Sequence, residues 1–471
     1  MTTRRAFAAA LFMSVTCAGT VFAQEGAIAA DVRREREALH QDCIENKAII
    51  GCATTLFTGD PLHVATGTIA PQNGMGFGPT IVWHWTPSNN WRWTGSADGV
   101  AASGGGWRVG SYATIVRTAV DIPREVTPGS PRRRQSRAIT SYPVIKLYTQ
   151  AISLPQVSFF GLGPNTTLAG KTFFGMRETV AGASTIWPIT PDNNFDRLRL
   201  SLFGEVNGRW VDVRNGPSGD VPSIGQLYTD ATAPGLSSQP GFIQFGEGVR
   251  ISPSLIGGHL RLSYAVRYQQ YQAPSDSLSS FQRWSVDLRH EIPLFGSSIP
   301  AARDTNGPNE CAIAPRASAC PQVALSRNRS GSLSLRAVLS RSVVSGAAAV
   351  PFYFQQTLGG SDLDGNRVLA SYEDYRFRGP HTVLFQEWFE HSLFGSPIGL
   401  VLSADQGNVS QQNVGLNFNG LVHTFAVGLS LRAGGLPVGL MTFATGGPEG
   451  HHFAITISPT LLGGSSRPAL Q

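Results

Sequence analysis

The 471-residue sequence has little charge, few cysteines and no long apolar run beyond its first residues. Only 14% of the residues are charged and the formal net charge is +6, which gives no argument for a nucleic-acid partner. After residue 23, no apolar run approaches the roughly 20 residues that a membrane helix needs. That absence leaves two classes open: a soluble exported protein, and a β-barrel with short, alternating spans.

Signatures of catalysis and of metal binding are also missing. The sequence has no Gly-x-Ser-x-Gly, no His-Glu-x-x-His and no P-loop, so we predict that the protein is not an enzyme and needs no cofactor. Spacing alone does not exclude a Ser and a His that converge from separate strands. His451 and His452 lack a third ligand, so no metal site is predicted.

Residues 1–23 are predicted to be a cleaved secretory signal peptide. Arg4 and Arg5 form its charged start, an apolar core follows over 6–15, and Val21-Phe22-Ala23 precede the cleavage site. The exported chain then keeps four of its five cysteines. They form two closely spaced pairs, and in an oxidising compartment we predict two local disulfides, Cys43–Cys52 and Cys311–Cys320.

Composition divides the exported chain into three further parts. Residues 24–75 are predicted to be a periplasmic segment that forms a cap or plug, with one charged amphipathic helix over 27–46. From residue 76 the pattern has period two, and residues 76–462 are predicted to form the barrel. Residues 463–471 are a C-terminal tail.

The strand pattern is clearest over 258–271. Leu260, Leu262 and Tyr264 lie on one face, while Arg261 and Arg267 lie on the other. A face with two arginines does not fit the dry core of a sandwich, but it fits a wall between lipid and a wet lumen. We therefore predict an all-β fold, a transmembrane antiparallel β-barrel whose backbone groups are all paired by closure.

Sixteen strands are predicted, eleven before a long loop at 351–380 and five after it. Fourteen remain if the two weakest candidates, 156–160 and 241–253, fail. The candidates lie near 76–85, 91–101, 105–118, 142–152, 156–160, 171–184, 195–211, 241–253, 258–272, 280–292, 331–342, 381–392, 397–405, 421–432, 436–446 and 451–461.

Alternation of up and down strands predicts the side of each connection. Short links near 253–257, 393–397 and 433–436 fall on the periplasmic side, and long links at 120–141, 212–240 and 406–420 fall outside. The link at 293–330 fits badly, because it would be a long periplasmic connection. Either it is an excursion stapled by its two cysteines, or the strand parity is wrong there.

The loop at 351–380 is predicted to fold back into the lumen. Long connections without regular structure are usually functional, and this one carries Leu358-Gly359-Gly360, Tyr372 and Phe377. Together with Glu387 and the run 400–407, these residues resemble the barrel of the BamA/TamA family, the bacterial surface-antigen or outer-membrane assembly factors. The motif-level resemblance is confined to about 350–410.

The resemblance implies that an arginine at the loop tip contacts acidic residues of the following strands. It matches Asp405 and Gly407 to the family's strand motif and Glu387 to an inward acid. This chain departs from the family at Ala370, where the signature arginine is absent. We therefore predict that Arg376 or Arg378 contacts Asp405 or Glu387; the alternative is that both are lumen charges balanced by solvent.

The resemblance also implies a function. We expect an outer-membrane barrel of the assembly or translocation type, which opens between its first and last strands to insert or transport proteins. The sequence shows no room for the family's periplasmic domains after Ala23. The alternative is a passive outer-membrane pore or surface barrel that kept the fold without assembly activity. Expected partners are outer-membrane lipid and lipopolysaccharide, with client outer-membrane proteins or periplasmic accessory proteins, and no nucleic acid.

Overall fold

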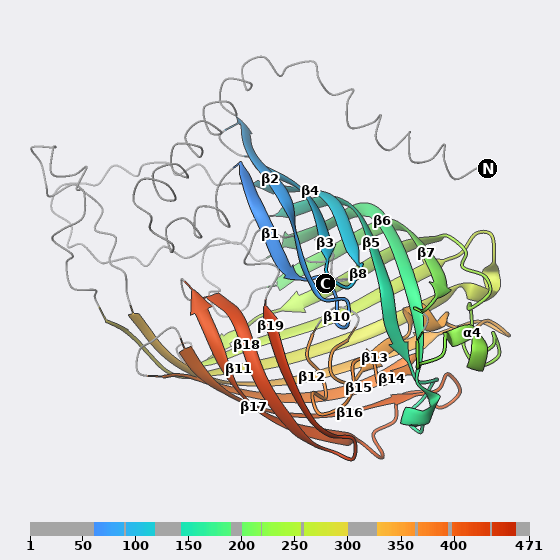
Figure 1. Cartoon of the computed structure of the whole chain (residues 1–471). Helices are drawn as coiled ribbons and strands as arrows, with labels where there is room; N and C mark the ends of the chain where they lie inside the picture. Colours follow the sequence, from blue (N-terminus) through green and yellow to red (C-terminus); the bar gives the residue numbers. More distant parts are fainter. Residues whose placement is uncertain are drawn as a thin grey trace, which may run out of the picture.

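The computed structural model describes residues 61–457 except 89–90, 118–142, 190–199, 218, 256–258, 300–326, 363–365, 394–397 and 434–435. The predicted signal peptide, the predicted helix at 27–46, the four cysteines predicted to form disulfides and the tail at 463–471 lie outside the described residues. Within them the chain forms one large antiparallel sheet that coils into a barrel (Figure 1). In the described part, no helix is long and apolar enough to cross a membrane.

Sixteen strands follow one another around the wall in the described residues, and each pairs with the next. They are β1 (Leu62–Thr68), β2 (Met75–Ser88), β3 (Trp91–Ala102), β4 (Trp107–Arg117), β5 (Val144–Phe159), β6 (Thr172–Pro188), β7 (Leu200–Asn215), β8 (Phe242–Ile251), β10 (Leu260–Gln272), β11 (Phe281–Ile299), β12 (Arg327–Val343), β15 (His381–Ser392), β16 (Ile398–Ser410), β17 (Val422–Ala433), β18 (Leu436–Gly447) and β19 (Gly450–Ile457).

The remaining elements are short. β9 (Ser254–Leu255) extends the pairing of β10, and β13 (Gln356–Leu358) pairs with β14 (Phe377–Gly379) inside the barrel. Four short helical turns lie in the connections: η3 (Leu168–Gly170), α4 (Ile224–Leu227), η5 (Ser277–Ser279) and η7 (Phe352–Phe354).

The predicted number of sixteen strands is confirmed, but one strand was missed and another was predicted as two. β1 lies within the segment 24–75 that was assigned to a cap or plug, so the barrel begins at Leu62 and not at residue 76. The predicted strands 142–152 and 156–160 are a single strand, β5, whose pairing with β6 is interrupted between Leu154 and Val157. Pro155 lies at this irregularity, where a residue without an N–H group is tolerated.

The additional first strand changes the side on which one connection falls. Eleven strands precede the long loop and five follow it, as predicted. However, β4 now ends at the same rim as β8, β15 and β17. The links that follow those three strands were assigned to the periplasmic side, so the prediction that 120–141 connects strands on the outside is wrong. We call the rim where β12 enters the long loop the loop end. Residues 160–171, 216–241 and 411–421 connect strands at the loop end.

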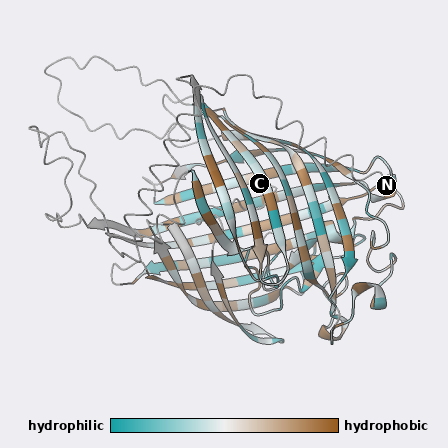
Figure 2. Ribbon diagram, turned by 45° about the horizontal axis from the view of Figure 1, so that its top comes forward, coloured by the Kyte–Doolittle hydropathy of each residue, from teal (hydrophilic) through white to brown (hydrophobic). Residues whose placement is uncertain are grey.

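The two faces of the wall differ in polarity. Along β17, Phe425, Val427 and Leu429 are exposed on the outer face, whereas Thr424 and Ser430 are buried on the inner face. The hydropathy colours alternate in the same way along many strands (Figure 2). Large exposed apolar side chains on a barrel exterior are expected in lipid and not in water. The protein is therefore a transmembrane antiparallel β-barrel.

Aromatic side chains lie on the outer face as well. Trp83, Trp85, Trp187, Trp210 and Trp284 are all exposed there, a position typical of residues at the membrane interface. Tyr112 differs from these residues, because its hydroxyl accepts a hydrogen bond from Gln150 inside the barrel.

The interior of the loop end is a hydrophobic core. Phe352 of the long loop packs edge-to-face on Phe159 and Phe174, with ring centroids 5.2 and 5.1 Å apart. Phe354 packs in the same manner on Phe242 at 4.9 Å. Edge-to-face pairs add to the stabilisation that burial of the rings gives. The long loop is therefore part of the core and not a surface excursion.

The two edge strands of the sheet approach each other. β1 pairs with β2 on one side and β19 pairs with β18 on one side. β1 and β19 come near each other over a short stretch (Figure 1), and in the described part of the chain no backbone ladder joins residues 64–68 to residues 450–457. We call this junction the seam.

Candidate functional site: the loop inserted in the barrel

Residues 344–380, which we call the tongue, turn back into the barrel and double on themselves. Gly359 and Gly360 form the turn with φ angles of +109° and +58°. A Cβ atom on Gly359 would lie 2.5 Å from Cβ of Arg376, and one on Gly360 would lie 2.6 Å from a carboxylate oxygen of Asp374. Both positions need glycine for conformation and for space. This explains the Leu358-Gly359-Gly360 motif.

The tip of the tongue is fixed to the wall by its backbone. The Leu369 N–H donates to Oδ2 of Asp405 at 2.9 Å, and the Ser371 N–H donates to Oγ1 of Thr424 at 3.0 Å. Both acceptors are buried on the inner faces of β16 and β17. A carboxylate that accepts a backbone N–H makes a stronger hydrogen bond than a neutral acceptor. Asp405 therefore anchors the tongue tip through a backbone donor.

The residue between these two anchors explains why the signature arginine is absent. The Ala370 side chain packs against Ala426 of β17 and Ala444 of β18, and all three are buried. Gly447 lies beside them, where an added Cβ atom would lie 2.7 Å from Tyr372. The wall facing position 370 is therefore shaped for a methyl group and has no space for a guanidinium.

Asp405 also joins a polar network on the wall. The Gln386 amide donates to Oδ1 of Asp405 at 3.3 Å and to the Arg367 carbonyl at 3.2 Å. Its oxygen accepts from Arg336 at 3.2 Å, and Arg336 makes two further bonds to Asp287 at 3.1 and 2.9 Å. The network thus runs across four neighbouring strands, β11, β12, β15 and β16, to the tongue tip.

Arg376 holds the other face of the tongue. Its guanidinium forms an ion pair with Glu449, in the turn between β18 and β19. It also donates to Oγ1 and to the carbonyl of Thr166, at 2.6 and 2.7 Å. Lys171 pairs with Glu373 of the tongue nearby. The tongue therefore connects the strands beside the seam to the 160–171 connection on another part of the wall.

Arg378 is buried, and no carboxylate of the described residues pairs with it. It is 1% exposed, its Nη1 donates to the Phe352 carbonyl at 2.9 Å, and its guanidinium lies within 6 Å of three phenyl rings, those of Phe159, Phe174 and Phe352. Burial lowers the pKa of Arg378 to about 10, so it stays charged at neutral pH. Cation–π contacts replace part of the lost hydration.

The predicted contact of Arg376 or Arg378 with Asp405 or Glu387 is therefore wrong. Arg376 contacts Glu449 and Arg378 contacts a carbonyl, while Asp405 accepts from the tongue backbone. Glu387 is exposed on the outer face, because the inward residue that pairs with Asp405 is its neighbour Gln386.

The inward placement of the tongue itself is as predicted. Leu358, Tyr372 and Phe377 are buried in one apolar cluster. Gly407 lies under Leu358, whose Cδ1 would be 3.0 Å from an added Cβ. Of the residues that the sequence reasoning missed, only Gln386 had a signal, since strand register places it opposite Asp405. Thr166 and Glu449 lie 210 and 73 residues from Arg376, and nothing local indicates them.

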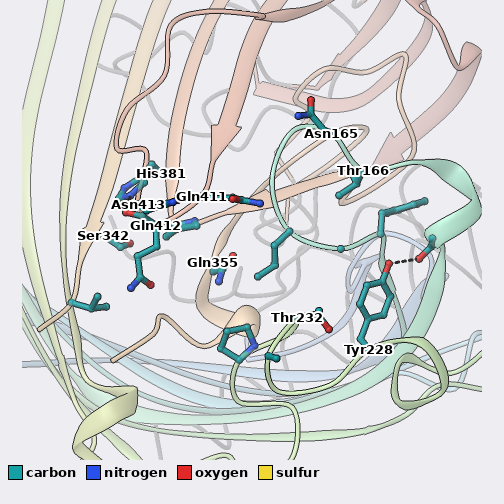
Figure 3. A pocket seen from close by; sticks show the side chains of 18 of the residues that line it. Asn165, Thr166, Tyr228, Thr232, Ser342, Gln355, His381, Gln411, Gln412 and Asn413 are labelled. Carbon is teal, nitrogen blue, oxygen red and sulfur yellow. Dashed lines mark hydrogen bonds between the residues drawn. The ribbon is translucent and has the colours of Figure 1, made fainter. Parts of the chain in front are cut away.

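A cavity of about 850 Å³ lies beside the tongue at the loop end (Figure 3). Amides and hydroxyls dominate its labelled lining, among them Gln355 of the tongue and Asn165 and Thr166 of the 160–171 connection. The Tyr228 hydroxyl donates to the Gly170 carbonyl at 2.7 Å and closes one side. The tongue therefore borders a cavity whose apolar lining carries amide and hydroxyl groups on this side, and a hydrophobic core on the other.

Comparison with known proteins gives similar barrels among solved structures. No protein-family model matches the sequence, and no curated protein matches it. The chain is similar to CdiB from Escherichia coli (11% identity, TM-score 0.47, 84% of this chain and 61% of that chain). It is also similar to CdiB from Acinetobacter baumannii (11%, TM-score 0.43, 84% and 56%) and to BamA from Haemophilus ducreyi lacking POTRA domains 1–3 (9%, TM-score 0.44, 84% and 70%).

The strand ladders, the apolar exterior and the inserted tongue define the class: a transmembrane β-barrel with an inward-folded loop. At 9–11% identity the likeness to these three structures is one of fold alone. This chain matches only 56% and 61% of the length of the two CdiB chains.

Proposed function

We propose that the protein is a bacterial outer-membrane barrel of the assembly or translocation type, which acts in the insertion or transport of proteins at that membrane. The observation that supports this most is the seam. Among the described residues, no ladder joins residues 64–68 of β1 to β19, and unpaired backbone groups are costly in lipid. Two such edges favour the addition of an incoming strand.

In this proposal, the tongue controls whether the seam opens. Its contacts with Asp405, Thr424 and Glu449 brace β16, β17 and the β18–β19 turn from inside. Release of these contacts would free the last strands to move away from β1, while the 160–171 connection keeps its own contacts with the tongue. Outer-membrane lipid and lipopolysaccharide are the proposed surroundings of the apolar exterior.

Cross-linking of the seam tests the proposal. Cysteines would be placed in pairs that scan Val64, Thr66 and Thr68 of β1 against Phe453 and Ile455 of β19, in a background whose four paired cysteines are serines. The expected result is that an oxidised pair stops insertion of an outer-membrane client into proteoliposomes and that reduction restores it. Unchanged insertion with a complete cross-link would contradict the proposal.

A matched control uses two strands that are already paired. Met441 and Ile455 are register partners of β18 and β19, so cysteines there cross-link neighbours without closing the seam. This variant should insert the client at the rate of the uncross-linked protein. If it also stopped insertion, the effect of the seam pairs would come from oxidation alone.

The alternative function, a passive pore or surface barrel, is favoured by one observation. At the tongue tip the signature arginine is replaced by Ala370, which packs in an alanine pocket. A seam cross-link should then leave a steady conductance in planar bilayers unchanged. Depletion of the protein separates the two functions in cells, because only an assembly function predicts a loss of other barrels from the outer membrane.

A further inference from the structure

Two neighbouring cavities lie at the loop end, between the 160–171 and 411–421 connections. The larger has a volume of about 850 Å³ and borders the tongue (Figure 3), and the smaller has a volume of about 360 Å³. Asn165, Thr166 and Gln411 line both cavities and so form a shared wall. Small-molecule sites usually have volumes of roughly 300–1,000 Å³. We call the two cavities together the loop-end groove.

The loop-end groove carries side-chain amides that the fold itself does not use. Within the described residues, no hydrogen bond reaches the exposed side chains of Asn165, Gln411 and Asn413. Gln411 is nevertheless held in place, because a Cβ atom on Gly163 would lie 3.3 Å from its Cγ and Nε2 atoms. Each amide has two N–H donors and an acceptor oxygen. The groove therefore offers both kinds of hydrogen-bonding group to a ligand.

Two buried polar atoms of the larger cavity also lack partners among the described residues. Gln355 is 4% exposed, and its amide nitrogen donates to the Val350 carbonyl at 2.9 Å, but its Oε1 accepts no hydrogen bond. His381 is 2% exposed, and its Nε2 bonds to the Gln412 carbonyl at 3.1 Å, which leaves Nδ1 as an acceptor without a donor. Buried polar groups are almost always hydrogen-bonded in native proteins. Hydroxyl groups in the cavity are suited to supply these two donors.

Charge forms only a small part of the lining. Arg341 and His381 are its basic residues, and no acidic residue of the described chain lines either cavity. Apolar side chains such as Leu162 and Val344 lie between the polar groups. A sugar unit matches this mixture, because it carries hydroxyls that both donate and accept around a ring of C–H groups. An extended peptide would instead need a row of free backbone groups, as a strand edge provides.

We propose that the loop-end groove is a binding site for a short chain of uncharged sugar units, either free or linked to a lipid. The two cavities take successive parts of the chain, and the amides of Asn165 and Gln411 contact it where it crosses their shared wall. Neither residue anchors the tongue, and the site uses no strand of the seam. The inference therefore goes beyond either function proposed above and does not depend on them.

Calorimetric titration of the full chain tests the proposal, in a detergent without a sugar headgroup. The probes are maltotriose, cellotriose, mannotriose and the trimer of N-acetylglucosamine, and at least one of them should bind saturably. Asn165→Ala combined with Gln411→Ala should weaken that binding at least tenfold. The matched control combines Gln272→Ala with Gln282→Ala, because these exposed amides lie at the same end of the barrel but outside both cavities. The control should change the affinity less than twofold.

A variant that fills the larger cavity gives an independent measurement. Ala231 is exposed and lines this cavity, so Ala231→Trp should abolish saccharide binding without removing a hydrogen-bonding group. Heat-modified migration of each variant shows whether its barrel has folded. The proposal is overturned if no probe binds the wild-type protein, if the control loses as much affinity, or if Ala231→Trp binds normally. Binding of a neutral Ser-Gly peptide in place of every saccharide would also overturn it.

A second titration distinguishes the two sources of the saccharide. Lipopolysaccharide with its outer saccharide chain and lipopolysaccharide without that chain are each added before the trisaccharide that binds. Competition by the long form alone identifies a lipid-linked chain as the ligand. Unchanged binding of the trisaccharide in both cases identifies a free oligosaccharide.

Discussion

The two faces of the tongue are both buried, yet they are held by different chemistry. The wall face, Leu369 to Ser371, meets β16 to β18 through backbone N–H donors and one methyl group. The rim face, which carries Glu373 and Arg376, meets the 160–171 connection and the β18–β19 turn through charged side chains.

The difference shows that the tip of the tongue can be anchored with an alanine at position 370. Asp405 accepts a hydrogen bond from the Leu369 backbone N–H. The short donors of the wall face allow few positions of the tongue, whereas the long side chains of the rim face tolerate small shifts. Packing should therefore determine how much the wall face contributes to stability, and ion pairs should determine how much the rim face contributes.

The largest effect is expected from restoring an arginine on the wall face. Ala370→Arg places a cation among Ala426 and Ala444, so we expect a loss of about 4 kcal/mol in the free energy of unfolding. Denaturant unfolding in detergent measures it, and Ala370→Ser is the small control, with less than about 1 kcal/mol. A stabilised Ala370→Arg protein would show that the arginine lock can still form with Asp405.

Breaking the ion pair of the rim face should have the next largest effect. Arg376→Ala leaves Glu449 buried without its cation, so we expect a loss of about 3 kcal/mol. The double variant with Glu449→Ala should recover part of that loss, because the unpaired carboxylate is then gone. Additive losses in the double-mutant cycle would mean that the pair contributes nothing beyond its separate side chains.

Removing the acceptor of the wall face should cost somewhat less. Asp405→Ala leaves the Leu369 N–H buried without a partner, at an expected cost of about 2 kcal/mol. Asp405→Asn keeps an acceptor oxygen and should lose only about half as much. Proteolysis of the tongue in the folded barrel gives a second measurement, and equal resistance of all three proteins would rule out an anchoring role.

A small change of opposite sign is expected at Arg378. Its guanidinium is fully buried with no carboxylate partner, so Arg378→Met should stabilise the barrel by about 1 kcal/mol. A clear destabilisation would show that the contacts with the three phenyl rings and the Phe352 carbonyl outweigh the cost of burying the charge. Arg378→Lys, which keeps the charge but not the planar group, separates these contributions.

The smallest effect concerns pH and Asp374 of the tongue. Burial raises the pKa of Asp374 above its usual 3.8, so the folded protein binds a proton more tightly than the unfolded chain. The folded state therefore loses stability as the pH rises from about 4 through the raised pKa. Compared with Asp374→Asn, the wild-type protein should become less stable over that window. Parallel curves for the two proteins would contradict this.

The general fold could be predicted because the alternation of side chains carries it. Runs such as Leu260 to Tyr268 show both faces of a wall in the local sequence. β1 was missed because its seven residues follow a segment of different composition, and the irregularity at Pro155 made one strand look like two. These two errors cancelled in the strand count, but they assigned the connection at 120–141 to the wrong rim.

The site could be predicted only in part. Asp405 was predicted from the family resemblance, and the inward course of the tongue from its length and from its Leu358-Gly359-Gly360 motif. The partners of Arg376 lie in other connections of the barrel. A single sequence gives no indication of which connections will lie next to each other. Glu387 was assigned inward although strand register places it outward.

The sequence by itself determined that this chain forms a two-faced wall with an inserted tongue, because period-two polarity and glycine turns are local properties. Only the tertiary structure decided which groups hold the tongue. Coiling of the wall brings residues together that are far apart in the chain, and a buried N–H group donates to whichever acceptor lies within reach. In this barrel, backbone N–H groups reach Asp405 and Thr424 first, and alanines fill the place of the arginine.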